Sequence, residues 1–201
     1  MKLANTHQTY GWVSIALHWG MALIILGLFP LGLYMTELDY YHPWYQLAPH
    51  IHRSIGILLL LLLLFRLCWR VISPPPQPVG GDSRWLQRIA ELAHWGLYLL
   101  LLAIALSGYL ISTADGRGVD VFDWFTVPAL IPGFPNMEDV AGAIHLTLAI
   151  IMMGLVGLHA MAALKHHFVD RDRTLLRMFG RSHQQQPGTH TLVNYYSKEN
   201  I

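Results

Sequence analysis

The sequence predicts an all-α protein, an integral membrane bundle of four helices that run up-down-up-down with both termini in the cytoplasm. The chain is 54% hydrophobic and only 12% charged, whereas an average soluble chain carries about 25% charged residues. Four apolar stretches are long enough to cross a hydrocarbon core of about 30 Å, which takes about 20 helical residues. The basic residues also lie almost entirely on one side of these stretches.

The four predicted spans belong to one transmembrane domain. The first apolar stretch is too long for the apolar region of a signal peptide, so it is interpreted as a transmembrane helix. Residues 1–169 are expected to form the transmembrane domain, and residues 170–201 a basic and polar cytoplasmic tail. Residues 73–81 are too rich in proline for a helix, and the segment 119–125 is expected to be a short amphipathic element at the surface. The spans are expected at about residues 12–35, 50–72, 88–112 and 140–164.

The distribution of charge predicts the orientation. Of the 13 Lys and Arg residues, only Arg53 and Arg117 fall on the side of the connections 36–49 and 113–139. The other eleven lie on the opposite side, in the remaining connection, in both terminal segments and at the ends of the spans that adjoin them. Short cytoplasmic segments of membrane proteins carry the excess of Lys and Arg. Both termini are therefore predicted to be cytoplasmic. Arg66 and Arg70, late in the second span, are expected to anchor that helix at the interface.

Two histidines in the fourth span indicate the chemistry. Ionisable side chains are costly inside a membrane and mark functional sites by default. His145 and His159 are 14 residues apart, which corresponds to about 21 Å along a helix and to nearly whole turns, so both rings lie on one side of it. Two cofactors stacked across a bilayer would need this arrangement.

Each of these histidines has a candidate partner at its own depth. His52 opens the second span near the periplasmic face, where His145 lies, and His18 lies early in the first span, at the depth of His159. Two imidazoles on an iron porphyrin leave no open coordination position, which favours electron transfer. There is no Cys-x-x-Cys-His motif for covalent haem attachment and Cys68 is the single cysteine, so two b-type haems with these four axial ligands are predicted.

Other readings of the histidines stay open. A lone membrane histidine often hydrogen-bonds a neighbouring helix, and zinc would need three or four ligands converging on one point. His94 and His166 lie toward the cytoplasmic side and are candidates for a quinone headgroup or for proton transfer. Arg53 adjoins His52 and is a candidate partner for a haem propionate, with a lipid phosphate as the alternative.

Several motifs resemble the bacterial cytochrome b561 family, over about residues 7–180. They are SIALHW from Ser14, HRSIGI from His52, AHWGLY from Ala93, GLH from Gly157 and HHFVDRDRTLLRM from His166. The segment ISTADGRGVDVFDWF from Ile111 resembles the YceJ-like branch. The resemblance implies haem b bound by His18 with His159 and by His52 with His145. It also implies a quinone region at His166, since one branch of the family oxidises superoxide and reduces ubiquinone.

The predicted function is a di-haem cytochrome of the bacterial inner membrane that transfers electrons between a periplasmic donor and the quinone pool. One alternative is an enzyme, a superoxide:ubiquinone oxidoreductase, against which the acidic loop 113–139 argues because superoxide is an anion. A second is a haem-bearing anchor subunit for a partner oxidoreductase that docks on residues 119–125. A third is a bundle without cofactor or one that transports a metal. A net charge of +1 gives no sign of nucleic acid binding.

Overall fold

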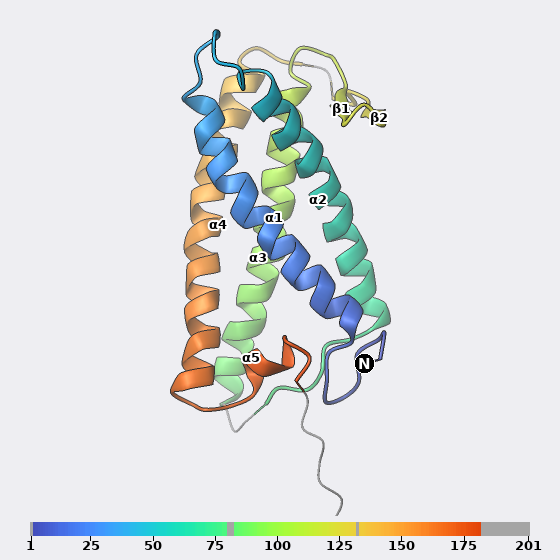
Figure 1. Cartoon of the computed structure of the whole chain (residues 1–201), viewed down its shortest axis with the longest axis vertical. Coiled ribbons are helices and arrows are strands. Elements are labelled where there is room, and N and C mark those ends of the chain that lie inside the picture. Colours follow the sequence, from blue (N-terminus) through green and yellow to red (C-terminus); the bar gives the residue numbers. More distant parts are fainter. Residues whose placement is uncertain (1, 80–82, 132, 182–201) are drawn as a thin grey trace, which may run out of the picture.

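The computed structural model describes residues 2–79, 83–131 and 133–181, and over these ranges four long helices dominate (Figure 1). Each is long and apolar enough to cross a membrane, which confirms the predicted fold class. Helix α2 begins before the predicted boundary, because Pro49 falls in its first turn, where proline is tolerated. The helices are α1 (Trp12–Thr36), α2 (Leu47–Ile72), α3 (Arg84–Ser112) and α4 (Met137–Phe168).

The helices alternate in direction along the bundle (Figure 1). Close backbone packing joins α1 with α2, α2 with α3, and α3 with α4. One end of the bundle carries the N-terminal segment and the short helix α5 (Thr174–Arg177), and we call it the α5 end. Asn5 fixes the N-terminal segment there, because its backbone N–H donates to Ser73 Oγ at 2.8 Å and its Nδ2 donates to the Ser73 carbonyl at 2.7 Å.

The opposite end, called the hairpin end, carries two short antiparallel strands, β1 (Val119–Val121) and β2 (Phe125–Val127). The predicted amphipathic element is therefore a hairpin. Its apolar side chains Val119 and Val121 are buried against Ile57 of α2. Ser54 of α2 fixes it further, because Ser54 Oγ accepts from the Phe122 N–H at 3.1 Å and donates to the Asp120 carbonyl at 3.4 Å.

A layer of apolar side chains fills the middle of the bundle. The residues come from all four helices and are almost fully buried: Met21, Leu59, Leu63, Leu101 and Met152. Met152 lies midway between His145 and His159 in α4. The core therefore separates two levels at which polar side chains enter the bundle.

The first part of the predicted tail packs on the bundle. Helix α5 contacts α4, the Trp19 indole N–H donates to the Met178 carbonyl at 2.8 Å, and the Phe179 ring stacks on Trp19 with centroids 4.9 Å apart. Residues up to 181 are thus attached to the α5 end. Residues 182–201 of the predicted tail lie outside the described residues.

Candidate functional site

At the hairpin end, His52 of α2 faces His145 of α4. Their ring centroids are 6.1 Å apart and the ring planes are inclined by 69°. His145 Nδ1 lies 2.9 Å from the Ile104 carbonyl, which can only accept, so the proton is on Nδ1 and the Nε2 lone pair remains available. Metal-bound histidines are oriented by hydrogen bonds of this kind.

Two glycines on neighbouring helices leave space for these two imidazole rings. A Cβ on Gly32 of α1 would lie 3.1 Å from His52 Cε1, and a Cβ on Gly108 of α3 would lie 3.0 Å from His145 Cε1. Real Cβ contacts are essentially never closer than 3.0 Å, so both positions sit at the limit of what a side chain allows. His52 Nδ1 is buried and has no hydrogen-bond partner among the described residues. The ring is therefore placed by packing.

At the α5 end, three histidines come together. His18 of α1 and His159 of α4 have ring centroids 6.2 Å apart, and His94 of α3 lies 5.2 Å from His159. The structure thus brings together the predicted pair and places His94 beside it. The two pairs, one at each end of α4, have nearly the same separation.

This separation fits axial ligation of a haem iron. A bond between a metal and an imidazole nitrogen is about 2 Å long, so two imidazoles on opposite sides of one iron have ring centroids about 6 Å apart. The His52–His145 and His18–His159 pairs match this value, and the His94–His159 pair is too close. Each matching pair also joins two helices, α2 with α4 and α1 with α4, that are not among the closely packed pairs of the described chain.

The small residues near the predicted ligands are consistent with a flat macrocycle. Five glycines in the helices that carry these ligands have no atom of the described chain within 4 Å of a Cβ built on them, so none is required for close helix packing: Gly20, Gly56, Gly142, Gly154 and Gly157. The residues at both levels therefore fit a haem.

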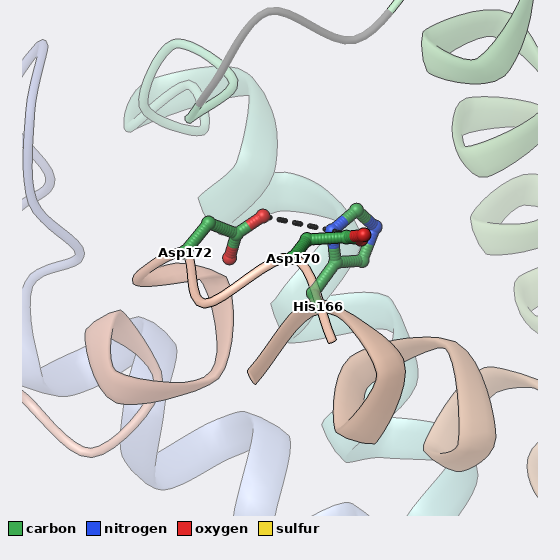
Figure 2. A group of neighbouring side chains, drawn as sticks. All are labelled: His166, Asp170 and Asp172. Atoms are coloured by element: carbon green, nitrogen blue, oxygen red, sulfur yellow. Dashed lines mark hydrogen bonds and ion pairs between the residues drawn. The ribbon is translucent and has the colours of Figure 1, made fainter. Parts of the chain in front are cut away.

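A single metal ion fits the histidine pairs less well. Within the described ranges, one group of three side chains brings its donor atoms within 4.8 Å of one another, and it contains none of the four predicted ligands. That group is His166, Asp170 and Asp172, at the C-terminal end of α4 (Figure 2). The three histidines His18, His94 and His159 do not converge in this way.

His166 is held by two carboxylates. Its Nδ1 lies 2.8 Å from Asp172 Oδ2 and 3.2 Å from Asp170 Oδ2 (Figure 2). Lys165 Nζ is 2.7 Å from the same Asp170 oxygen. A carboxylate accepts only, so Nδ1 carries the proton and Nε2 is turned away from the acids. Sequence reasoning selected His166 and missed Asp172, which falls six residues later in the same motif.

Arg53 is placed less specifically. It lies next to His52 at the hairpin end, its side chain is exposed, and its Nε donates to the Pro49 carbonyl at 3.3 Å. The same end of the bundle has a pocket with acidic lining residues Asp115, Glu138 and Asp139. The acidic character of this loop, expected from the sequence, is thus concentrated at one place.

The comparisons with known proteins agree with this geometry. The family model described as prokaryotic cytochrome b561 matches residues 9–181. The chain belongs to the prokaryotic cytochrome b561 family. It is 50% identical over 182 residues to cytochrome b561 homolog 2 of Escherichia coli (strain K12), covering 90% of this chain and 97% of that protein. It is 34% identical over 173 residues to the "Probable superoxide oxidase CybB" of Yersinia pestis, covering 86% and 96%.

Membership of the cytochrome b561 family confirms part of what the sequence predicts. The chain is a multi-pass protein of the bacterial inner membrane that takes part in electron transfer, and the family implies haem b. The family is shown and the branch within it is not, so placement in the YceJ-like branch stays a prediction.

Proposed function

We propose that this cytochrome b561 binds two haem b groups and transfers electrons across the inner membrane between a periplasmic donor and the quinone pool. The observation that carries the proposal is that two histidine pairs at two levels of one bundle have nearly equal ring-centroid separations, 6.1 Å in one pair and 6.2 Å in the other. Haem b supplies reversible one-electron transfer when it is bound. The ligands would be His52 and His145 at the hairpin end, and His18 and His159 at the α5 end.

The orientation follows from charge. The α5 end carries most of the basic residues and is assigned to the cytoplasm, and the hairpin end, with the acidic pocket, is assigned to the periplasm. We call the cofactors at the two ends the outer haem, held by His52, and the inner haem, held by His18. The domain comprises residues 1–169, and residues 170–201 are cytoplasmic.

The quinone region is proposed at the α5 end, between His94 and His166. Reduction of a quinone consumes protons as well as electrons, so a proton donor is needed beside the inner haem. His166 has its Nδ1 fixed by Asp172, which leaves Nε2 to face a ligand. An imidazole whose Nδ1 is fixed in this way can bind and release a proton at Nε2.

Superoxide oxidation is the second candidate, supported by the similarity to the protein of Yersinia pestis that is named for it. The acidic pocket at the hairpin end disfavours it, because Asp115, Glu138 and Asp139 repel an anion at the proposed outer face. A third candidate is an anchor subunit, for which the exposed aromatic side chains Trp124 and Phe125 of the hairpin offer a docking surface to a periplasmic protein.

The experiment that tests the proposal is a reduced-minus-oxidised visible spectrum of the purified chain with a haem-to-protein ratio. Two b-type haems per chain are expected, and one or none would contradict the proposal. Stopped-flow measurement of quinone reduction then separates the candidates. Rapid reduction with superoxide as sole donor favours the enzyme, and reduction that needs a co-purifying periplasmic protein favours the anchor subunit.

A further inference from the structure

Three arginines lie at the α5 end, and one of them, Arg66, contacts His18. Arg66 and Arg70 come from the last turns of α2, and Arg177 is the last residue of α5. Their guanidinium groups lie over aromatic rings: Arg66 Cζ is 5.5 Å and Arg70 Cζ 5.9 Å from the Tyr98 centroid, and Arg177 Cζ is 5.7 Å from that of Tyr10. Helices α2 and α5 thus supply the cations of one cluster, and α3 and the N-terminal segment supply its aromatic rings.

Arg66 points into the bundle, so the expectation that it is an interfacial anchor is wrong. Its Nε donates to Tyr98 Oη at 3.1 Å, its Nη2 lies 3.3 Å from His18 Nδ1, and its Nη1 lies 4.0 Å from Met21 Sδ. Met21 is only 4% exposed and belongs to the apolar core. A permanent positive charge therefore stands between the core and His18.

Arg177 has donors without acceptors. Its Nη1 donates to the Gln77 carbonyl at 2.8 Å, but its Nε and Nη2 are buried and have no hydrogen-bond partner among the described residues. Buried donors are normally satisfied, because an unpaired donor keeps the cost of its desolvation, and this cost is larger when the group is charged. Two such donors on one guanidinium indicate an acceptor that the chain itself does not provide.

Tyr10 lies within reach of the charges of all three arginines. Burial raises the pKa of Tyr10, and the charges of Arg177, Arg70 and Arg66 act on it in the opposite direction. No carboxylate balances these charges: the ion pairs found in the described chain join Arg117 or Lys165 or His166 to aspartates, and none includes an arginine of this cluster. The three side chains are half-buried, and a partly desolvated charge without a counter-ion is unfavourable, so the cluster favours an anion.

The contact between Arg66 and His18 also requires another acceptor for Arg66. A guanidinium has donors only, so His18 Nδ1 accepts the hydrogen bond in this arrangement. A neutral histidine that binds iron through Nε2 carries its proton on Nδ1 and cannot accept there. Arg66 must then turn to a different acceptor beside the same ring.

We propose that Arg66, Arg70 and Arg177 form an anion site for the propionate carboxylates of the inner haem. The inference rests on the proposed function, because it needs a haem at His18 and His159. Guanidinium groups form bidentate hydrogen bonds with carboxylates, and three of them can hold two. Tyr10 and Tyr98 add hydroxyl groups at the rim of the site.

The other anion within reach is the phosphate of a lipid headgroup. Two observations favour the carboxylates. Arg66 contacts His18 and the core residue Met21, which a lipid headgroup at the interface would not approach. The unsatisfied donors of Arg177 are buried and are not exposed at the surface.

The test uses the full-length haem-loaded chain and redox titration followed by visible spectroscopy. In a His145→Ala background the inner haem is titrated alone. Arg66→Gln and Arg177→Gln are each expected to lower its midpoint potential, because loss of a cation beside an anionic propionate favours the oxidised haem. The expected shift is at least tenfold in the redox equilibrium constant, or about 59 mV for a one-electron couple.

The control is Arg88→Gln, which removes an exposed charge from α3 at the same end of the bundle and should leave the potential unchanged. Arg66→Lys and Arg177→Lys retain the positive charge, so the midpoint potential of the inner haem in these variants should return most of the way to the wild-type value. If Arg66→Gln loses the inner haem, recovery of that haem in Arg66→Lys supports the site, and failure to recover it contradicts the site.

Mass spectrometry of the intact protein in lipid nanodiscs that contain phosphatidylglycerol provides the second arm. One outcome is that Arg177→Gln loses a bound phosphatidylglycerol while the midpoint potential of the inner haem is unchanged in both Arg66→Gln and Arg177→Gln. That outcome would assign the site to a lipid phosphate and overturn the proposal. Unchanged potentials and unchanged lipid would overturn it as well. A wild-type chain with fewer than two haems would instead refute the proposed function, so the two failures are distinguishable.

Discussion

His52 and His145 face each other at one end of the bundle with their ring centroids 6.1 Å apart, and His18 and His159 repeat this relationship at the other end at 6.2 Å. Each pair includes one histidine of α4, so a single helix sets the distance between the two levels. The apolar layer around Met152 lies between them.

Removal of one ligand should empty one site. We expect His159→Ala to lose the inner haem and keep the outer one, which halves the haem-to-protein ratio, and His145→Ala to do the reverse. His94→Ala should keep both haems, because the His94–His159 spacing of 5.2 Å is too short for axial ligation. A pyridine haemochrome assay measures the ratio. Two low-spin haems in His159→Ala, or one in His94→Ala, would show that the pairing is wrong.

The glycines beside the outer ligands should be sensitive to the addition of one methyl group. Gly108→Ala places a Cβ 3.0 Å from His145 Cε1, and overpacking of this kind costs about 1–3 kcal/mol. We expect a changed spectrum or lower occupancy of the outer haem with the inner haem unaffected. Gly27→Ala is the control, since no described atom lies within 4 Å of its Cβ. Equal effects on both haems would contradict the local explanation.

The carboxylate of Asp172 should matter for quinone reduction and not for haem binding. Asp172→Asn keeps the shape of the side chain and removes the charge that fixes His166 Nδ1 at 2.8 Å. Loss of such an orienting partner typically costs about 10–100-fold, so a comparable fall in the rate of quinone reduction is expected at unchanged haem content. Asp170→Asn should have a smaller effect, because its distance is 3.2 Å. Equal rates of quinone reduction in the wild type, Asp172→Asn and Asp170→Asn would exclude a role of Asp172 in quinone reduction.

The same aspartate predicts a dependence of local stability on pH. Partial burial raises the pKa of Asp172, but hydrogen bonds from Thr174 and His166 outweigh this and hold it below its usual value. Its stabilising contribution is therefore complete above the ordinary aspartate pKa of about 3.9 and is lost as the pH falls through the lowered value. Hydrogen exchange of residues 166–177, corrected for intrinsic rates, should increase in acid, and Asp172→Asn should remove most of this increase.

The hairpin should depend on one buried hydroxyl. Ser54 is fully buried and bonds both Phe122 and Asp120, so Ser54→Ala leaves a backbone N–H without its partner at a cost of about 1–3 kcal/mol. Limited proteolysis between residues 119 and 127 should become faster, with haem content unchanged. Thr147→Ala, which removes an exposed hydroxyl that bonds only within α4, should leave cleavage as it is.

The fold could be predicted almost completely from the sequence, and the site only in part. Hydrophobic runs bounded by charges determine where helices cross a membrane, and the 14-residue spacing of His145 and His159 determines two levels. The predicted start of the second span, at about residue 50, differs from the start of α2 at Leu47, because Pro49 is compatible with the first turn of a helix. Both pairings remain predictions about haem, but the structure brings the rings of each pair to about the same separation, 6.1 and 6.2 Å between centroids.

The residues that sequence reasoning missed depend on contacts between distant segments. Arg66 looks like an interfacial cation next to a run of leucines, and only the packing of α1 and α3 shows that it reaches His18 and Tyr98. The same holds for Gly32 and Gly108, whose neighbours are rings on other helices. The hairpin was missed because Val119 and Val121 alternate over only three residues, too few to separate a strand from a turn of helix.

The position of α4 has a consequence for how the protein is made. This helix is the last of the four to leave the ribosome, and under the proposed pairing it supplies one ligand to each haem. Neither cofactor can be fully coordinated while only the first three helices are in the membrane. A chain that stalls during insertion would hold no six-coordinate haem at either level, so incomplete copies would not carry electrons across the membrane.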